Sequence, residues 1–166
     1  MKNLSISKKL ITGFGAVLVV LILSITLSLF SAGKLGEIIE SYGKYTVPNN
    51  TGVWIIRRNI VSAQRYMSQA FFEKDIQVIE DLFTQAGKDE AEAVEQLEQY
   101  AVNQRNTDRD EKIQELKGVF EQAGPVRQEI ASLILTQSST NLQKAQELFH
   151  SQYVPLFDHA TDILAD

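Results

Sequence analysis

The apolar residues of this chain fall into two patterns: one continuous run near the N-terminus and, after it, stripes at helical spacing. The run covers residues 10–33, which are 24 consecutive residues without a formal charge. A helix of that length extends about 36 Å, enough to cross the ~30 Å hydrocarbon layer of a membrane. Because lipid offers the backbone no hydrogen-bond partners, a single segment can cross it only as a helix. The run therefore predicts a transmembrane helix.

Beyond the run, apolar residues recur at steps of three and four, the spacing of one helix face. Polar breaks divide this pattern into helices over about 34–73, 76–103, 109–136 and 140–166. No window alternates apolar and polar residues long enough to predict a strand. We therefore expect an all-α fold, in which the transmembrane helix continues into an antiparallel up-down-up-down four-helix bundle.

Three prolines fall inside these helices. Pro48 is expected to kink the first long helix or to begin a new one, and Pro125 and Pro155 to bend the third and fourth. In the fourth helix, the apolar stripe that should face the core is Leu142, Ala145, Phe149, Tyr153, Leu156, Ala160 and Ile163.

The charges that flank the run predict its orientation. Lys2, Lys8 and Lys9 precede it without any acid, so residues 1–9 should be a cytoplasmic tail and residues 34–166 should be periplasmic or extracellular. The chain is then expected in the inner (plasma) membrane. A cleaved signal peptide is the alternative, but a cut after Ala32 would place Phe30 where a small residue is required.

Helix lengths suggest how the chain relates to the membrane at its other end. Past the membrane the first helix has about 39 residues, or roughly 58 Å, whereas the fourth has about 27, or roughly 41 Å. The fourth helix would stop short of the membrane with its apolar stripe still running. We therefore expect a longer protein, truncated here before a second membrane span.

Composition excludes several classes of function. Residues 35–166 hold 12 basic and 21 acidic residues, a net charge of −9, which argues against binding nucleic acid or anionic lipid surfaces. There is no cysteine, phosphate-binding glycine loop or nucleophile–histidine pattern. His150 and His159 are nine residues apart and so lie on opposite helix faces, which disfavours paired metal ligation. We expect no enzyme, no cofactor and no metal.

A basic stretch within this acidic domain is the candidate binding site. Residues 41–72 contain Lys44, Arg57, Arg58 and Arg65 and no acid. Arg58 and Arg65 are seven residues apart and share a helix face, and guanidinium groups suit carboxylates. One interpretation is a membrane-distal pocket for a small organic anion.

The fourth helix would supply the opposite wall of that pocket, with the side chains Gln146, His150 and Tyr153. The alternative is structural: Arg65 pairs with Glu80 and Asp81, Arg58 pairs with Glu90 and Glu92, and Phe149 and Tyr153 are core residues.

Two further features concern helix packing. Ser24, Ser28, Ala32 and Gly36 recur at every fourth residue, and small residues at that spacing let membrane helices approach closely. They predict a helix–helix seam, although chance in a Ser-rich span is an alternative. The only tryptophan, Trp54, is expected in the core or in a dimer contact.

Three segments carry a resemblance to a known family. The opening Met1–Phe14, the segment Tyr45-Thr-Val-Pro48, and the segment Tyr153-Val-Pro-Leu-Phe-Asp158 resemble the four-helix-bundle sensor domain of bacterial methyl-accepting chemotaxis proteins. The resemblance covers essentially the whole chain. What that family has and this chain lacks is the second span, the HAMP relay and the methylated signalling hairpin.

The resemblance implies a ligand-sensing domain of a transmembrane chemoreceptor. It also implies a homodimer that senses a small molecule or a periplasmic binding protein, and that contacts cytoplasmic signalling partners only through the missing C-terminal part. In related receptors, first-helix arginines hold the ligand across the dimer interface, but this sequence does not reproduce their spacing. The same sensor precedes histidine kinases and cyclases, and a single-span anchor or interaction protein is a further alternative.

Overall fold

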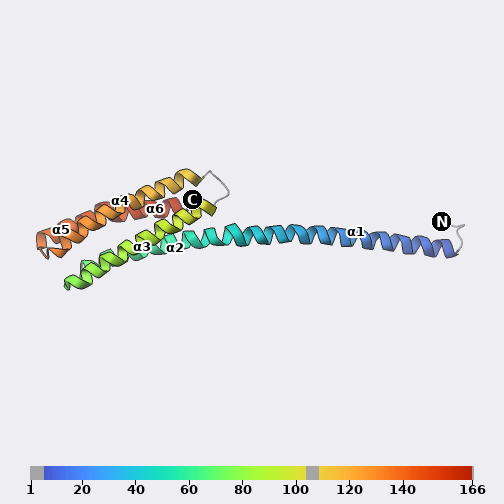
Figure 1. Cartoon of the computed structure of the whole chain (residues 1–166), viewed down its shortest axis with the longest axis horizontal. Helices are drawn as coiled ribbons and strands as arrows, with labels where there is room; N and C mark the ends of the chain where they lie inside the picture. Colours follow the sequence, from blue (N-terminus) through green and yellow to red (C-terminus); the bar gives the residue numbers. More distant parts are fainter. Residues whose placement is uncertain (1–5, 104–108, 166) are drawn as a thin grey trace. The chain divides into compact units, whose positions relative to one another are not determined.

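A computed structural model describes residues 6–103 and 109–165. No strand occurs in these residues, and the all-α four-helix bundle predicted from the pattern is confirmed. The chain divides into two compact units, Met1–Thr46 and Val47–Asp166. Helices α2, α3, α4 and α6, which form the bundle, are labelled in Figure 1.

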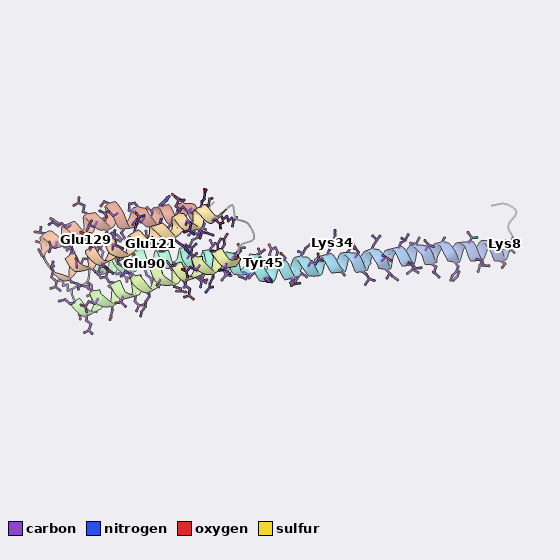
Figure 2. All side chains as sticks on the ribbon, turned by 45° about the horizontal axis from the view of Figure 1, so that its top comes forward. Lys8, Lys34, Tyr45, Glu90, Glu121 and Glu129 are labelled. Atoms are coloured by element: carbon purple, nitrogen blue, oxygen red, sulfur yellow. The ribbon has the colours of Figure 1, made fainter. Side chains whose placement is uncertain are left out.

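The first unit contains α1 (Ile6–Ser41) and the π-helical turn η1 (Tyr42–Thr46). An 18-residue window of this helical segment has a mean hydropathy of 2.6 and no buried residue, so it is long and apolar enough to cross a membrane. Its side chains project on every side in Figure 2. Residues 1–5 of the predicted tail lie outside the described residues.

One polar side chain within the apolar run, Thr26, has a partner in its own helix. The Thr26 hydroxyl donates to the carbonyl of Ile22 at 2.8 Å, one helical turn earlier. This bond satisfies the hydroxyl without a second chain, as a lipid environment requires. Ser24, Ser28, Ala32 and Gly36 are all exposed, so the seam along them stays a prediction.

Four antiparallel rods form the second unit. They are α2 (Val47–Ala70), α3 (Ile76–Asn103), α4 (Asp110–Leu135), and a composite of α5 (Ser139–Leu148), η3 (Phe149–Tyr153) and α6 (Val154–Ala165). Asp75 caps α3, because its Oδ1 accepts the N–H of Gln77 at 2.9 Å. The α2–α3 turn and the α4–α5 turn lie at the same end of the bundle, which we call the tip. They are joined there by a hydrogen bond of 2.8 Å from the side-chain amide of Gln137 to the carbonyl of Lys74.

Prolines explain the two π-helical turns. η1 ends two residues before Pro48, and η3 ends two residues before Pro155. A proline lacks the N–H for the preceding turn and its ring collides with the carbonyl four residues earlier. A wider i→i+5 turn relieves that collision while the helix continues. Pro125 differs, since α4 runs through it as ordinary α-helix.

One buried core residue of the fourth rod, Phe157, was not predicted from the sequence. Leu156 is half-buried, whereas Phe157 is 0% exposed and packs between Tyr153 and Phe120. Phe157 lies four residues after Tyr153, and Ala160 is buried as predicted, so Phe157 belongs to the same inward face, while Leu156 packs at its edge. Phe149 and Tyr153 are buried, which confirms their interpretation as core residues.

Candidate functional site

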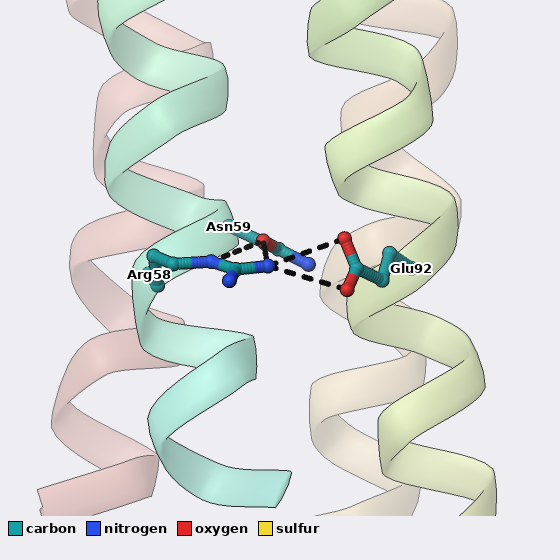
Figure 3. A network of polar contacts seen from close by, with 3 residues as sticks. All are labelled: Arg58, Asn59 and Glu92. Atoms are coloured by element: carbon teal, nitrogen blue, oxygen red, sulfur yellow. Dashed lines mark hydrogen bonds and ion pairs between the residues drawn. The ribbon is translucent and has the colours of Figure 1, made fainter.

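One arginine on the basic face of α2 forms an ion pair inside the bundle. Arg58 donates to both carboxylate oxygens of Glu92 on α3, at 3.2 and 3.3 Å, and to Oδ1 of Asn59, as Figure 3 shows. The Arg58 and Glu92 side chains are 48% and 45% exposed. Water screens a pair so exposed, so it contributes little to stability. The predicted ion pair of Arg58 with Glu92 is confirmed.

Arg65 lies two turns farther along the same helix and is exposed. Its guanidinium lies 5.1 Å from the ring centroid of Tyr66. Among the described residues it has no carboxylate within ion-pair distance, so the pairing predicted with Glu80 and Asp81 does not form. Arg65 therefore offers a solvent-facing cation on an otherwise acidic domain.

The fourth rod meets α2 in a different register from the one predicted. Arg57 donates to the backbone carbonyl of Leu164, and the ring of Phe71 meets that of Phe149 at 5.4 Å. The residues opposite Arg58 and Arg65 are therefore those between Phe149 and Leu164.

Consequently, the six predicted site residues are not brought together. Gln146 lies beyond the Phe149 contact toward the tip, and His150 is exposed with its ring against Phe149. Tyr153 is turned into the core toward α3. The three arginines stay together on α2. Their binding role, and that of the three fourth-rod residues, stays a prediction.

A buried charged cluster holds three helices together. Glu90 of α3 accepts hydrogen bonds from Arg127 of α4 at 3.1 Å and from the Tyr153 hydroxyl at 2.7 Å. The Glu90 side chain, labelled in Figure 2, is 7% exposed and that of Arg127 is 19% exposed. The predicted pairing of Glu90 with Arg58 is wrong, because Arg127 binds that carboxylate.

Burial sets the ionisation of this cluster. It raises the pKa of Glu90 above its ordinary value, and the hydrogen bond from Tyr153 and the charge of Arg127 offset part of that rise. Burial and the nearby Glu90 carboxylate also raise the pKa of Tyr153. The phenol is thus held as a proton donor to the carboxylate.

Gly87 makes room for this cluster. A Cβ at that position would lie 2.9 Å from the guanidinium carbon of Arg127. Arg127 was missed because Glu90 was predicted to face α2 and pair with Arg58, whereas it faces α4. A glycine inside a helical stripe, one turn before a glutamate, is the signal that could have indicated a bulky side chain arriving from a neighbouring helix.

Comparison with known proteins decides the family. Residues 3–166 match the family described as a four helix bundle sensory module for signal transduction, the module of methyl-accepting chemotaxis proteins. The chain belongs to this family. Searches of curated proteins and of solved structures found no match. The sensory module therefore serves signal transduction in a receptor of this kind.

One exposed face of the sensory module carries large apolar side chains on α2. Val47, Trp54 and Val61 are 54%, 61% and 64% exposed, and they are spaced seven residues apart. The Arg58 guanidinium lies 5.6 Å from the Trp54 ring centroid. Trp54 is therefore not a core residue. We call Val47, Trp54 and Val61 the α2 stripe.

Elsewhere in the sensory module, an exposed histidine of α6 lies beside a glutamate of α4. His159 and Glu115 lie 2.9 Å apart, and both are about half exposed. Within residues 6–103 and 109–165, no group of three histidine or acidic side chains is arranged to hold a metal ion. The family is one of signalling receptor domains.

Proposed function

We propose that this module is the ligand-sensing part of a dimeric, membrane-anchored chemoreceptor that binds a small organic anion on α2. The observation that supports it most directly is Arg65, an exposed guanidinium without an acidic partner among the described residues, seven residues from Arg58. Guanidinium groups bind carboxylates through two parallel hydrogen bonds. Arg58 lies on the same face, so an acid with more than one carboxylate would bind Arg65 and compete with Glu92 for Arg58.

The proposed topology follows from the lysines before the apolar helix. With Lys2, Lys8 and Lys9 in the cytoplasm, α1 anchors the protein and the bundle lies on the far side of the membrane. A periplasmic binding protein docking on the bundle is the other proposed stimulus. In that case the receptor would respond only when the binding protein is present, and a free acid alone would give no response.

The α2 stripe supports pairing of two copies through this helix. Apolar residues that recur every seven positions supply one of the two positions per heptad that contact a second helix in a left-handed coiled coil. The anion-binding arginines then lie beside the dimer contact. A ligand there would shift one packed helix against another, and two packings that differ by a few kcal/mol suffice for a switch.

Pairing through α2 predicts a specific cross-linking result. The protein has no native cysteine, so Val61→Cys introduces a single thiol on the stripe. In membranes treated with a mild oxidant, we expect this variant to form a disulfide-linked dimer, measured by non-reducing electrophoresis. The control, Gln128→Cys, places a thiol at an exposed position of α4 and should stay monomeric. Equal cross-linking of the two variants would contradict pairing through α2.

Anion binding predicts a loss of affinity when Arg65 is neutralised. We expect succinate or citrate to bind the full chain in nanodiscs, measured by isothermal titration calorimetry. Arg65→Gln should weaken this binding about tenfold or more, because a hydrogen bond between charged groups contributes roughly 1.5–3 kcal/mol. Lys144→Gln, an equal charge change on α5, should leave it unchanged. Neither acid binding, or both variants titrating like the unmodified protein, would refute the proposed site.

A further inference from the structure

A surface cleft runs between α3 and α4, and the Glu90–Arg127 pair lines one end of it. Its lining on α3 extends from Gly87 to Glu98, about 16 Å along the helix axis. Its volume is about 390 Å³, within the range of ~300–1,000 Å³ that is usual for small-molecule sites. The cleft is therefore elongated and large enough for a small ligand.

The guanidinium of Arg127 lines this cleft with an edge that is not used inside the bundle. Its Nε donates to both carboxylate oxygens of Glu90 at 3.1 Å. In the part of the chain that the structure describes, Nη1 and Nη2 have no hydrogen-bond acceptor. Gly87 leaves room for them, because a Cβ there would lie 2.9 Å from Nη1 and 3.0 Å from Nη2. Glu90 thus holds the guanidinium in place, and its Nη1–Nη2 edge can bind a carboxylate through two parallel hydrogen bonds.

Acidic side chains line the cleft farther from Arg127. Glu121, labelled in Figure 2, is six residues before Arg127 on α4, about 9 Å along the helix axis. Glu98 of α3 also lines the cleft, and the single charge of Lys117 offsets only one of these two carboxylates. A ligand with only negative charge would be repelled by Glu98 and Glu121, and one with only positive charge would leave Arg127 unpaired. The lining therefore favours a ligand that carries both charges.

The lining between these charged groups is apolar. It consists of Ala91 and Val94 from α3 and Phe120 from α4. Methylene groups are favoured against such a surface, because contact removes apolar area from water. A chain of several methylenes matches the distance between Arg127 and Glu121 better than an α-amino acid does, since the two charged groups of an α-amino acid are attached to one carbon.

From these observations we propose that the α3–α4 cleft is a second ligand site, which binds an ω-amino acid. The carboxylate of the ligand binds the Nη1–Nη2 edge of Arg127, and its ammonium group pairs with Glu121. The methylene chain between them lies against Val94 and Phe120. This site is separate from the arginines on α2. Because it bridges α3 and α4, its occupant would change how these two helices pack.

Titration with ω-amino acids tests the site. We expect at least one of γ-aminobutyrate, δ-aminovalerate and ε-aminocaproate to bind the full chain in phosphatidylcholine nanodiscs, measured by isothermal titration calorimetry. Valerate lacks the ammonium group and pentylamine lacks the carboxylate, so each should bind more than about tenfold more weakly. Glycine, which lacks the chain, should also bind more weakly. The proposal is overturned if none of the three ω-amino acids binds, or if valerate or pentylamine binds as tightly as they do.

Variants at the two ends assign the binding to this cleft. Glu121→Gln should weaken binding of the tightest ω-amino acid about tenfold or more. Glu129→Gln, an equal charge change at an exposed position of the same helix, should not alter it. Arg127→Lys keeps a cation for Glu90 but has no second edge for a carboxylate, so it should weaken binding by a similar factor, with circular dichroism showing that the helices are retained. Equal binding by Glu121→Gln and Glu129→Gln would overturn the proposal.

A blocking variant tests the cleft without changing the buried cluster. Ala91 is exposed on the cleft wall, so Ala91→Phe fills the cleft and should abolish ω-amino acid binding while the helices are retained. Arg65→Gln should leave this binding unchanged, and Ala91→Phe should leave the binding of succinate or citrate unchanged. Failure of the α2 site and failure of this cleft are thus seen independently. Undiminished ω-amino acid binding by folded Ala91→Phe would place the ligand elsewhere and refute the assignment.

Discussion

Replacing Arg127 with methionine should lower the free energy of unfolding by about 3–5 kcal/mol at neutral pH, because it leaves a buried carboxylate without its cation. The loss should depend on pH. Burial already raises the pKa of Glu90, and removing Arg127 removes a contribution that lowers it. The variant's folded state then holds a proton more tightly than its unfolded state does.

The raised pKa of Glu90 in the folded variant sets how its loss of stability changes with pH. The deficit is largest above the folded-state pKa of Glu90 and shrinks as pH falls through it toward the ordinary value of 4.5. Urea unfolding of the full chain in nanodiscs, followed by circular dichroism at pH 7.5 and 5, measures it. Lys117→Met removes a cation that lines the same surface cleft as Glu90 and Arg127, and it should change the free energy of unfolding only slightly. A deficit equal to that of Lys117→Met, or one that grows at pH 5, would contradict the assigned role.

Truncating Phe157 to alanine should destabilise the bundle by about 3–5 kcal/mol, the usual cost of removing a buried aromatic ring. Phe157 is 0% exposed, and its ring meets Tyr153 edge-on at 4.9 Å and Phe120 at 5.7 Å. Its loss leaves a cavity and removes both ring contacts, so the same urea titration should show a lower midpoint. The matched control is Phe72→Ala.

Phe72 is 85% exposed at the tip, so its truncation should change stability by less than about 0.5 kcal/mol. Similar effects for the two phenylalanines would mean that the fourth rod does not pack as described. Leu156→Ala adds a stricter comparison, because Leu156 is adjacent to Phe157 and only half-buried. A larger loss for Leu156 than for Phe157 would mean that Phe157 is not the residue buried at the centre of the core.

The helices and most of the core were predictable because helical periodicity needs only local sequence. The steps of three and four place Ile60, Leu97 and Ile130 on inward faces, and each is at most 1% exposed. The prediction omitted Phe157 just after η3, although Ala160 beyond it is buried as predicted. Leu156 and Phe157 are adjacent apolar residues, and a pattern of steps of three and four does not decide which of the two lies deeper in the core.

Contacts were predictable only where the register was short-range. Arg58 and Glu92 lie on a hairpin with a tight turn, so counting outward from the turn pairs them correctly. The register of the fourth rod against α2 depends on three connections and a wide turn. An error of a residue or two in the length of each one adds to the error in the predicted register. Glu90 and Arg127 also lie on consecutive helices, 37 residues apart, but the helical pattern does not show whether this carboxylate of α3 faces α2 or α4, so the pairing with Arg58 was wrong.

The exposed indole of Trp54 gives this protein a built-in optical reporter. It is the only tryptophan in the sequence, so the emission has a single source. Water surrounds it in an isolated subunit, and the guanidinium of Arg58 lies near its ring. A neighbouring subunit that covers it, or an acid that draws Arg58 away, would change the colour and yield of its fluorescence without any attached dye.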